Sequence, residues 1–304
     1  MVAVVGPTAV GKSQFVLRLA RYFSLEIINA DSRQVYRYMD IGTNKPSVAE
    51  RALVPHHVID VVDPDEHFSL AIYHQLARRA LENIEKKGNI AFLVGGTGLY
   101  VWSLIEGWKI PQVPPDPELR DQLEQRARRE GSYSLYRELQ KIDPITASKI
   151  NPANVRRIIR GLEIYQATKR PPSQLQGKEP PKFRVLIIGL TQERNELYKK
   201  IDQRVDKMIK EGLIDEVKGL LARGYSPSLP SMSGIGYREV VRFLQGETTL
   251  PKAIERIKYE THRLARHQYA WFRLSDTRIK WLDVGDISKA ESDARKLIED
   301  FLAS

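Results

Sequence analysis

The residues near the N-terminus that could do chemistry form one phosphate-binding motif. They are Gly6, Pro7, Thr8, Ala9, Val10, Gly11, Lys12 and Ser13, which match G-x-x-x-x-G-K-[ST]. The motif follows an apolar segment and opens a helical pattern, so its backbone N–H groups are expected to curl around phosphate oxygens. Lys12 is expected to reach the distal phosphate, and the Ser13 hydroxyl to ligate Mg²⁺. The motif predicts a bound phosphate chain without identifying its carrier.

Many nucleotide triphosphatases have a second strand that ends in an aspartate, which holds the metal ion. The sequence shows no clear strand of this kind. Residues 58–63 end in Asp63 and could take that role, but the apolar run 90–94 is followed by Gly95, Gly96, Thr97 and Gly98 with no acid. We therefore expect the phosphates to be bound as a leaving group and not to be hydrolysed.

Asp31 follows the second apolar run and opens a polar stretch that includes Ser32, Arg33 and Gln34. Ligands of open parallel sheets bind outside the carboxyl ends of the strands, so Asp31, the phosphate loop and Thr97 are expected on one rim. A carboxylate there could ligate a metal ion, act as a general base, or cap a helix.

The elements that must position these residues alternate between strand and helix. Strands are predicted at 2–5, 26–29, 58–62, 90–94, 185–190 and 279–284, with helices such as 12–22 and 70–87 between them. This order predicts an α/β protein with a parallel sheet covered on both faces. The alternation stops at 108–182, where proline-rich segments bracket helical patterns at 118–130, 135–142 and 155–168. A helical insertion is the simplest interpretation.

The chain is basic, and the excess charge is concentrated in the insertion. The 304 residues carry a formal net charge of +10 and no cysteine. Residues 108–182 contain 15 lysines and arginines against 9 aspartates and glutamates, which leaves +6. This distribution favours a localised anionic partner over a general contribution to solubility. No apolar run approaches the roughly 20 residues of a membrane helix, and no signal peptide is evident, so we expect a cytoplasmic protein.

Several motifs together resemble the tRNA dimethylallyltransferase family, bacterial type. They are Gly6–Ser13, Asp31–Tyr36, Met39–Pro46, Gly95–Tyr100, Asn154–Arg160, Ile235–Glu239 and Arg263–Gln268. The resemblance implies a P-loop kinase-like core, residues 1–107 and 183–304, with a tRNA-binding helical insertion at 108–182. It implies Mg²⁺ as cofactor and dimethylallyl diphosphate as donor. The acceptor is N6 of adenosine 37 in the tRNA anticodon stem-loop, and we expect a monomer.

The resemblance also implies roles for single residues. Asp31 is the general base for the adenine amine, Thr97 is catalytically important, and Lys12 stabilises the leaving diphosphate together with Mg²⁺ on Ser13. Arg204 is expected to help bind diphosphate. The residues expected to contact tRNA are Asp31, Ser32, Arg33, Gln34, Arg120, Arg156, Arg157, Ile158, Ile159, Arg160, Gly236, Tyr237 and Arg238.

Other side chains allow more than one interpretation. Tyr36 either stacks on a base or packs against the sheet. Arg156 and Arg160 share a helical face, with Ile158 and Ile159 on the buried side. The helix expected at 254–273 carries basic and aromatic residues, of which we expect Trp271 and Phe272 in the core. The adjacent His56 and His57 lack acidic neighbours at metal-ligand spacing and are expected to be structural.

Three alternative functions are compatible with parts of the sequence. An isopentenyltransferase acting on free adenine nucleotides shares the expected chemistry, but it does not need a basic insertion. A P-loop small-molecule kinase predicts phosphoryl transfer from ATP without an allyl donor. A non-catalytic RNA-binding module predicts that Asp31→Ala leaves the biological activity unchanged.

Overall fold

The computed structural model describes residues 1–181 and 183–304, which form two compact units. The first comprises residues 1–105 and the chain that follows residue 181, and the second comprises residues 106–181. The sequence predicts a catalytic core at 1–107 and 183–304 and a tRNA-binding insertion at 108–182. The fold alone does not test these two roles, so they remain predictions. The end of that insertion, Lys182, lies outside the described residues.

The first unit is built on a six-stranded sheet of order β3-β2-β4-β1-β7-β8. Its strands are all parallel to their neighbours, and Val2 of β1 pairs with Phe92 of β4 and with Leu186 of β7. The strands are β1 (Val2–Val5), β2 (Leu25–Asn29), β3 (His56–His57), β4 (Ile90–Val94), β7 (Leu186–Thr191) and β8 (Ile279–Asp283). The expected α/β parallel-sheet fold is confirmed.

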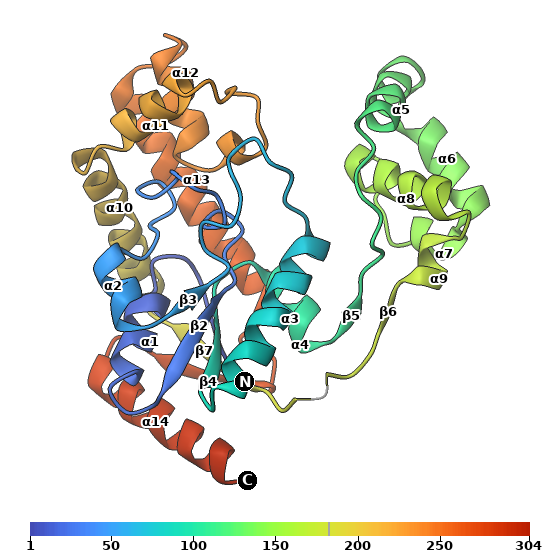
Figure 1. Cartoon of the computed structure of the whole chain (residues 1–304). Coiled ribbons are helices and arrows are strands. Elements are labelled where there is room, and N and C mark those ends of the chain that lie inside the picture. Colours follow the sequence, from blue (N-terminus) through green and yellow to red (C-terminus); the bar gives the residue numbers. More distant parts are fainter. Residues whose placement is uncertain (182) are drawn as a thin grey trace. The chain divides into compact units, whose positions relative to one another are not determined.

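Helices cover both faces of this sheet (Figure 1). On one face α1 (Lys12–Leu19) packs with α14 (Ile287–Ala303), and on the other α3 (Leu70–Lys86) packs with α4 (Gly98–Ile105). The remaining helices of this unit are α2 (Val48–Leu53), α10 (Arg194–Lys210), α11 (Leu213–Ala222), α12 (Tyr237–Leu244) and α13 (Leu250–Trp271), with a 3-10 turn at Ser231–Ser233. No helix among the described residues is long and apolar enough to cross a membrane.

The strand expected at 58–62 is wrong. The third strand is the short β3, and the residues after it are irregular because Val58 and Asp60 adopt positive φ angles of 62° and 54°. Asp60 then turns its carboxylate to Lys45 and Arg51, at 2.6 Å from each. Asp63, the acid that ends this segment, pairs with Arg37 at 3.0 Å. Both acids of residues 58–63 are therefore engaged in ion pairs within the protein.

Glu26 is a buried carboxylate in β2 that ties together the ends of neighbouring elements. It accepts hydrogen bonds from Lys87 Nζ at 3.0 Å and Asn89 Nδ2 at 2.9 Å, and its second oxygen lies 2.6 Å from His57 Nε2. Burial raises the pKa of Glu26, but the hydrogen bonds from His57, Lys87 and Asn89 outweigh it and hold the pKa at about 2. His57 is structural, as expected.

Glu26→Gln is expected to lower the free energy of unfolding at pH 7 by about 2–3 kcal/mol. The ordinary pKa of this carboxyl is 4.5, so its stabilising charge is fully present above that pH and is lost as the pH falls toward 2. Urea unfolding at pH 7 and pH 3 measures the effect, with the exposed Glu82→Gln on α3 as control. Equal losses at both pH values would contradict this account.

The second unit is a helical cluster closed by a short antiparallel pair. Its elements are β5 (Trp108–Lys109), α5 (Pro117–Glu130), α6 (Ser132–Ile142), α7 (Pro144–Ala147), α8 (Val155–Thr168), α9 (Pro172–Leu175) and β6 (Gly177–Lys178). Asp116 and Asn154 cap α5 and α8 by accepting hydrogen bonds from backbone N–H groups of the first turns. Its core is made of Leu123, Leu135, Leu139, Ala147, Ile158, Ile159 and Leu162.

Candidate active site

The phosphate loop connects β1 to α1 and has the backbone that its glycines permit. Gly6 and Gly11 have φ angles of 143° and 98°, and a Cβ at Gly6 would lie 2.4 Å from Leu190 O. No side chain caps α1, so the N–H groups of its first turn remain available to an anion. Ser13 lies in this turn and lines a cavity with Lys12.

Two half-buried cations lie beside the loop. Lys12 Nζ donates to Gly6 O at 3.0 Å and Pro7 O at 2.8 Å, and burial lowers its pKa to about 8, against the opposing influence of Asp31. Arg204 Nη1 donates to Thr8 Oγ1 at 3.2 Å, while its Nε has no partner among the described residues. Burial lowers the pKa of Arg204 to about 10. Two desolvated charges this close together form a site that favours an anion.

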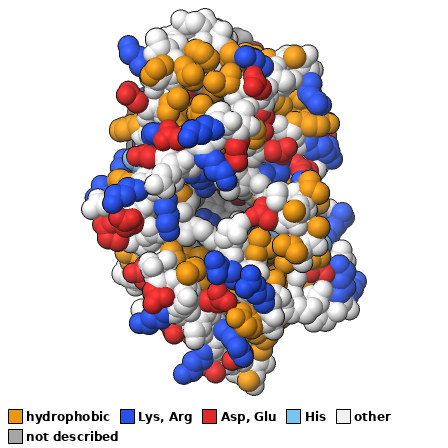
Figure 2. Space-filling view, turned by 90° about the vertical axis from the view of Figure 1, so that its left-hand side faces the viewer, with side chains coloured by type: hydrophobic (Ala, Val, Ile, Leu, Met, Phe, Trp, Pro, Cys, Tyr) orange, Lys and Arg blue, Asp and Glu red, His pale blue; other side chains and the backbone are white. Residues whose placement is uncertain are grey.

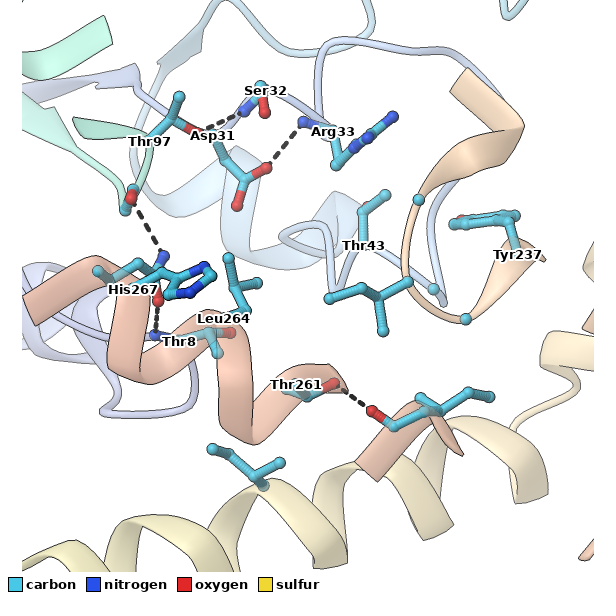
Figure 3. A pocket seen from close by; sticks show the side chains of 18 of the residues that line it. Thr8, Asp31, Ser32, Arg33, Thr43, Thr97, Tyr237, Thr261, Leu264 and His267 are labelled. Carbon is cyan, nitrogen blue, oxygen red and sulfur yellow. Dashed lines mark hydrogen bonds between the residues drawn. The ribbon is translucent and has the colours of Figure 1, made fainter. Parts of the chain in front are cut away.

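Asp31 follows β2 and does not open a helix. Its Oδ1 accepts from Arg33 N–H at 2.8 Å, and its own N–H donates to Asn29 Oδ1 at 3.1 Å. Its Oδ2 has no hydrogen-bond partner in the described parts of the chain, and the carboxylate points into the cavity (Figure 3). Of the roles considered for Asp31, the helix cap is wrong, and one oxygen is left free.

Thr97 connects the end of β4 to the Asp31 turn. Its N–H donates to Ala30 O at 3.1 Å, and its Oγ1 accepts from Ser32 N–H at 3.0 Å. The adjacent glycines allow this contact, because a Cβ at Gly95 would lie 2.2 Å from Ala30 O. Thr97 therefore contacts the backbone next to Asp31.

Two cavities meet at these residues. The first has a volume of about 430 Å³ and an apolar wall contributed by α10 and α13. That wall consists of Ile201, Val205, Met208, Ile257 and Leu264. The second has a volume of about 320 Å³ and includes Lys12 and Ser13. Both are lined by Thr8, Asp31, Thr43 and Arg204.

Lysine and arginine side chains also lie around a hollow on one face of the molecule (Figure 2). This is the face toward which α2 and α10 lie in Figure 1. The second cavity is lined by three cations, Lys12, Lys200 and Arg204, against two acids, Asp31 and Glu50. A small anion is therefore the ligand that the second cavity favours by charge.

Other expected contact residues of the first unit have structural partners. Gln34 donates its amide to Thr43 O at 3.2 Å and Asn44 O at 3.1 Å. Arg33 donates to Pro230 O at 2.9 Å. Arg33, Gly236 and Tyr237 line the first cavity, Gln34 lines the second, and Arg238 pairs with Glu239. Tyr36 is buried, so the packing interpretation holds for it.

Glu216 of α11 joins two loops at the edge of the first cavity. Its carboxylate accepts from the N–H groups of Asp40, Ile41 and Gly42 at 2.9, 2.7 and 3.1 Å, and from Tyr237 Oη at 2.6 Å. A Cβ at Gly42 would lie 2.5 Å from the Tyr237 ring. Residues 40–42 and the start of α12 are therefore fixed to one another.

In the second unit, the expected RNA-contact residues divide into a buried and an exposed group. Ile158 and Ile159 lie in the core, so a side-chain contact with RNA is wrong for them. Arg120 and Arg160 both bind Glu163, which is 1% exposed, with Arg120 Nε at 2.8 Å. The exposed residues without an ion pair among the described residues are Arg156 and Arg157.

Several lining residues were not expected from the sequence. Gln268, Leu264, His267 and the apolar residues of α10 line the first cavity, and nothing in their spacing distinguishes them from core positions. Trp271 also lines it and is 42% exposed, so its expected place in the core is wrong, whereas that of Phe272 is confirmed. Gly98 makes room for the Trp271 ring, which a Cβ would meet at 2.3 Å.

Comparisons with known proteins agree over most of the chain. Residues 34–275 match the family model described as IPP transferase. The tRNA dimethylallyltransferase of Thermomicrobium roseum is 52% identical over 93% of this chain and 86% of its own length, and that of Dehalococcoides mccartyi is 44% identical over 100% and 93%.

Solved structures are also similar. The tRNA isopentenylpyrophosphate transferase of Bacillus halodurans is 40% identical, with a TM-score of 0.71 and coverage of 98% of this chain and 96% of that chain. A eukaryotic dimethylallyltransferase acting on tRNA is 30% identical, with a TM-score of 0.85 and coverage of 100% of this chain and 79% of that chain.

Proposed function

Because this chain belongs to the IPP transferase family, we propose that it transfers the dimethylallyl group of dimethylallyl diphosphate to N6 of adenosine 37 in tRNA. The proposal rests on one observation above all. Two half-buried cations, Lys12 and Arg204, line the second cavity together with Asp31, which has a free carboxylate oxygen. An anionic leaving group and a general base are the two requirements for alkylating a weakly nucleophilic amine.

On the donor side, the diphosphate binds in the second cavity. Negative charge develops on the diphosphate as its bond to the allyl carbon breaks. Lys12, Arg204 and the first-turn N–H groups of α1 stabilise this charge. Thr8 N–H is already bonded to Gln268, so this group of the loop is assigned no phosphate contact. The apolar wall of the first cavity then suits the allyl group, which has no polar atoms.

A divalent cation fits the same place. The Ser13 hydroxyl lines the second cavity, and among the described residues no three His, Cys, Asp or Glu side chains are placed to hold a metal ion by themselves. Such a sparse donor set suits Mg²⁺, which keeps several waters and binds mainly through substrate phosphates. When bound, Mg²⁺ supplies further neutralisation of the diphosphate charge.

On the acceptor side, Asp31 holds and removes a proton. The N6 lone pair attacks C1 of the allyl group, and the C1–O bond breaks with its electron pair passing to the diphosphate. The proton from N6 passes to Asp31 Oδ2, whose partner Oδ1 is fixed by Arg33 N–H. Ser32, Arg33, Gly236 and Thr97 line the same cavity as Asp31 and are assigned to hold an adenosine extruded from its stack.

The second unit is assigned to binding the anticodon stem-loop. It contributes the exposed Arg156 and Arg157, and Arg120 with Arg160 around the buried Glu163. Since both cavities are lined by one chain, the monomer is proposed as the functional unit. Because its proposed substrate is tRNA, the protein is proposed to act in the cytoplasm.

Replacing both Arg156 and Arg157 by glutamine is expected to weaken tRNA binding and to flatten its salt dependence. Losing two phosphate contacts reduces the slope of log K against log salt by about 1.4–1.8. Filter binding between low and moderate salt measures this slope. The matched control replaces Arg128 and Arg129, which are exposed on α5, with the same charge change. An equal slope change in both double variants would exclude a specific contact.

The proposal is tested with radiolabelled dimethylallyl diphosphate, Mg²⁺ and unmodified tRNA, with AMP and ATP as alternative acceptors. Label in the anticodon loop is the expected result. Label only in AMP or ATP would assign the chain to the free-nucleotide enzymes. Phosphoryl transfer from ATP without use of the allyl donor would instead identify a kinase.

A further inference from the structure

Gln268 of α13 connects the two loops that carry the site. Its side-chain Oε1 accepts a hydrogen bond from Thr8 N–H at 2.7 Å, and its Nε2 donates to Gly96 O at 3.1 Å. Gln268 is 8% exposed, so both bonds are shielded from water. Its amide is therefore held on one side by the phosphate loop and on the other by the end of β4.

The packing around this amide leaves it little freedom. A Cβ at Gly96 would lie 2.1 Å from Gln268 Nε2, so the backbone approaches the side chain as closely as glycine allows. One turn further along α13, the Trp271 ring packs against Gly98 in the same way. α13 therefore packs directly against residues 96–98, the segment that contains Thr97.

Each loop held by Gln268 leads by a further contact to one reacting group. On the donor side, Thr8 Oγ1 accepts from Arg204 Nη1 at 3.2 Å. On the acceptor side, Thr97 binds Ala30 O and Ser32 N–H, the backbone on either side of Asp31. Hydrogen bonds joined by single residues of backbone therefore connect Arg204 at the anion site with the two neighbours of Asp31, and Gln268 lies in the middle of this connection.

We infer that Gln268 is a positioning residue that sets the distance between the bound diphosphate and the Asp31 carboxylate. The inference rests on the proposed function, because the two groups must act on one allyl carbon and one amine. Gln268 touches neither reacting atom in this scheme. A displacement of 1 Å between reacting groups costs about 10²-fold in rate, so loss of the amide lowers kcat and leaves tRNA affinity in place.

Three variants test the inference. Gln268→Leu removes both hydrogen bonds at similar volume and is expected to lower kcat by about 10²-fold, with the Kd for tRNA within about twofold of wild type. The control is Tyr269→Phe, the next residue on α13, which loses the hydrogen bond between Tyr269 and Thr191 (2.9 Å) away from the cavity. Its kcat is expected to remain within about twofold.

Gln268→Glu provides a readout that a merely structural role does not give. A protonated carboxyl accepts from Thr8 N–H and donates to Gly96 O as the amide does, whereas the carboxylate cannot donate. Burial and the adjacent Gly96 carbonyl disfavour the carboxylate and raise the pKa of this carboxyl above its ordinary range. The kcat of Gln268→Glu relative to wild type is therefore expected to recover as the pH falls from 8 to 5.5. A ratio independent of pH, or a wild-type kcat in Gln268→Leu, would overturn the inference.

Hydrogen exchange keeps this test separate from the proposed function. In Gln268→Leu, the peptides containing Thr8 and Gly96 are expected to exchange faster together, and in Tyr269→Phe neither does. Unchanged exchange of either peptide would overturn the positioning role whatever the reaction. If wild type transfers no label to tRNA while both peptides lose protection, the proposed function fails and the connection between the loops stands.

Discussion

Replacing Asp31 by asparagine is expected to lower kcat for prenyl transfer to tRNA by about 10³-fold, within the range of general-base catalysis. Asparagine keeps an oxygen that can accept from Arg33 N–H, so the turn is preserved. Its amide cannot take the proton that leaves N6. The loss therefore falls on the chemical step, and tRNA binding is expected to remain within about twofold of wild type.

Single-turnover transfer with saturating donor measures this effect directly. The matched control is Asp215→Asn, the same chemical change on an exposed carboxylate of α11. A rate in Asp31→Asn within tenfold of the control would remove Asp31 from the role of base. A parallel collapse of tRNA binding would instead make it a binding residue.

Replacing Lys12 by methionine is expected to weaken binding of dimethylallyl diphosphate by about 10²-fold, because a buried charge-assisted contact is lost. Lys12→Met should also lower kcat, since the same charge stabilises the leaving group. Binding of tRNA alone should not change. Calorimetric titration of the donor without tRNA measures the first effect, with the exposed Lys199→Met of α10 as control.

The pH dependence of donor binding follows from the same residue. Burial holds the pKa of Lys12 at about 8 in the free protein, so its ammonium is charged below that pH and neutral above it. The diphosphate keeps its charge above pH 7, so affinity should fall about tenfold per pH unit above 8. Lys12→Met should lack this decline. The same decline in wild type and variant would assign it to another group.

The fold and part of the site could be predicted because the signals are local. The phosphate loop and the strand β4 are continuous in sequence, and the carboxyl ends of parallel strands must share one edge of the sheet. That rule alone brought Asp31, Thr97 and Lys12 to one rim. The expected strand at 58–62 failed because apolar composition does not reveal the positive φ angles of Val58 and Asp60.

Residues that act through distant partners were not predictable in this way. Gln268 bonds to groups 260 and 172 positions away in the sequence. It ends the motif Arg263–Gln268, but that motif does not indicate which loops its side chain connects. The spacing of Arg156 and Arg160 indicates a shared helical face but does not show that a buried Glu163 binds one of them. Trp271 has the spacing of a core residue, yet its ring lines the first cavity and contacts Gly98 at the start of α4, which leaves it 42% exposed.

The carboxylate of Glu216 also restricts how a substrate can enter. Parting residues 40–42 from α12 breaks the bonds that it accepts from Asp40, Ile41, Gly42 and Tyr237. At about 1.5 kcal/mol or more for each bond to a charged group, this opening costs about 6 kcal/mol. The open population is then about 1 in 10⁴, so this side of the first cavity acts as a fixed wall. An adenosine therefore enters and leaves the first cavity through openings that do not require residues 40–42 to separate from α12.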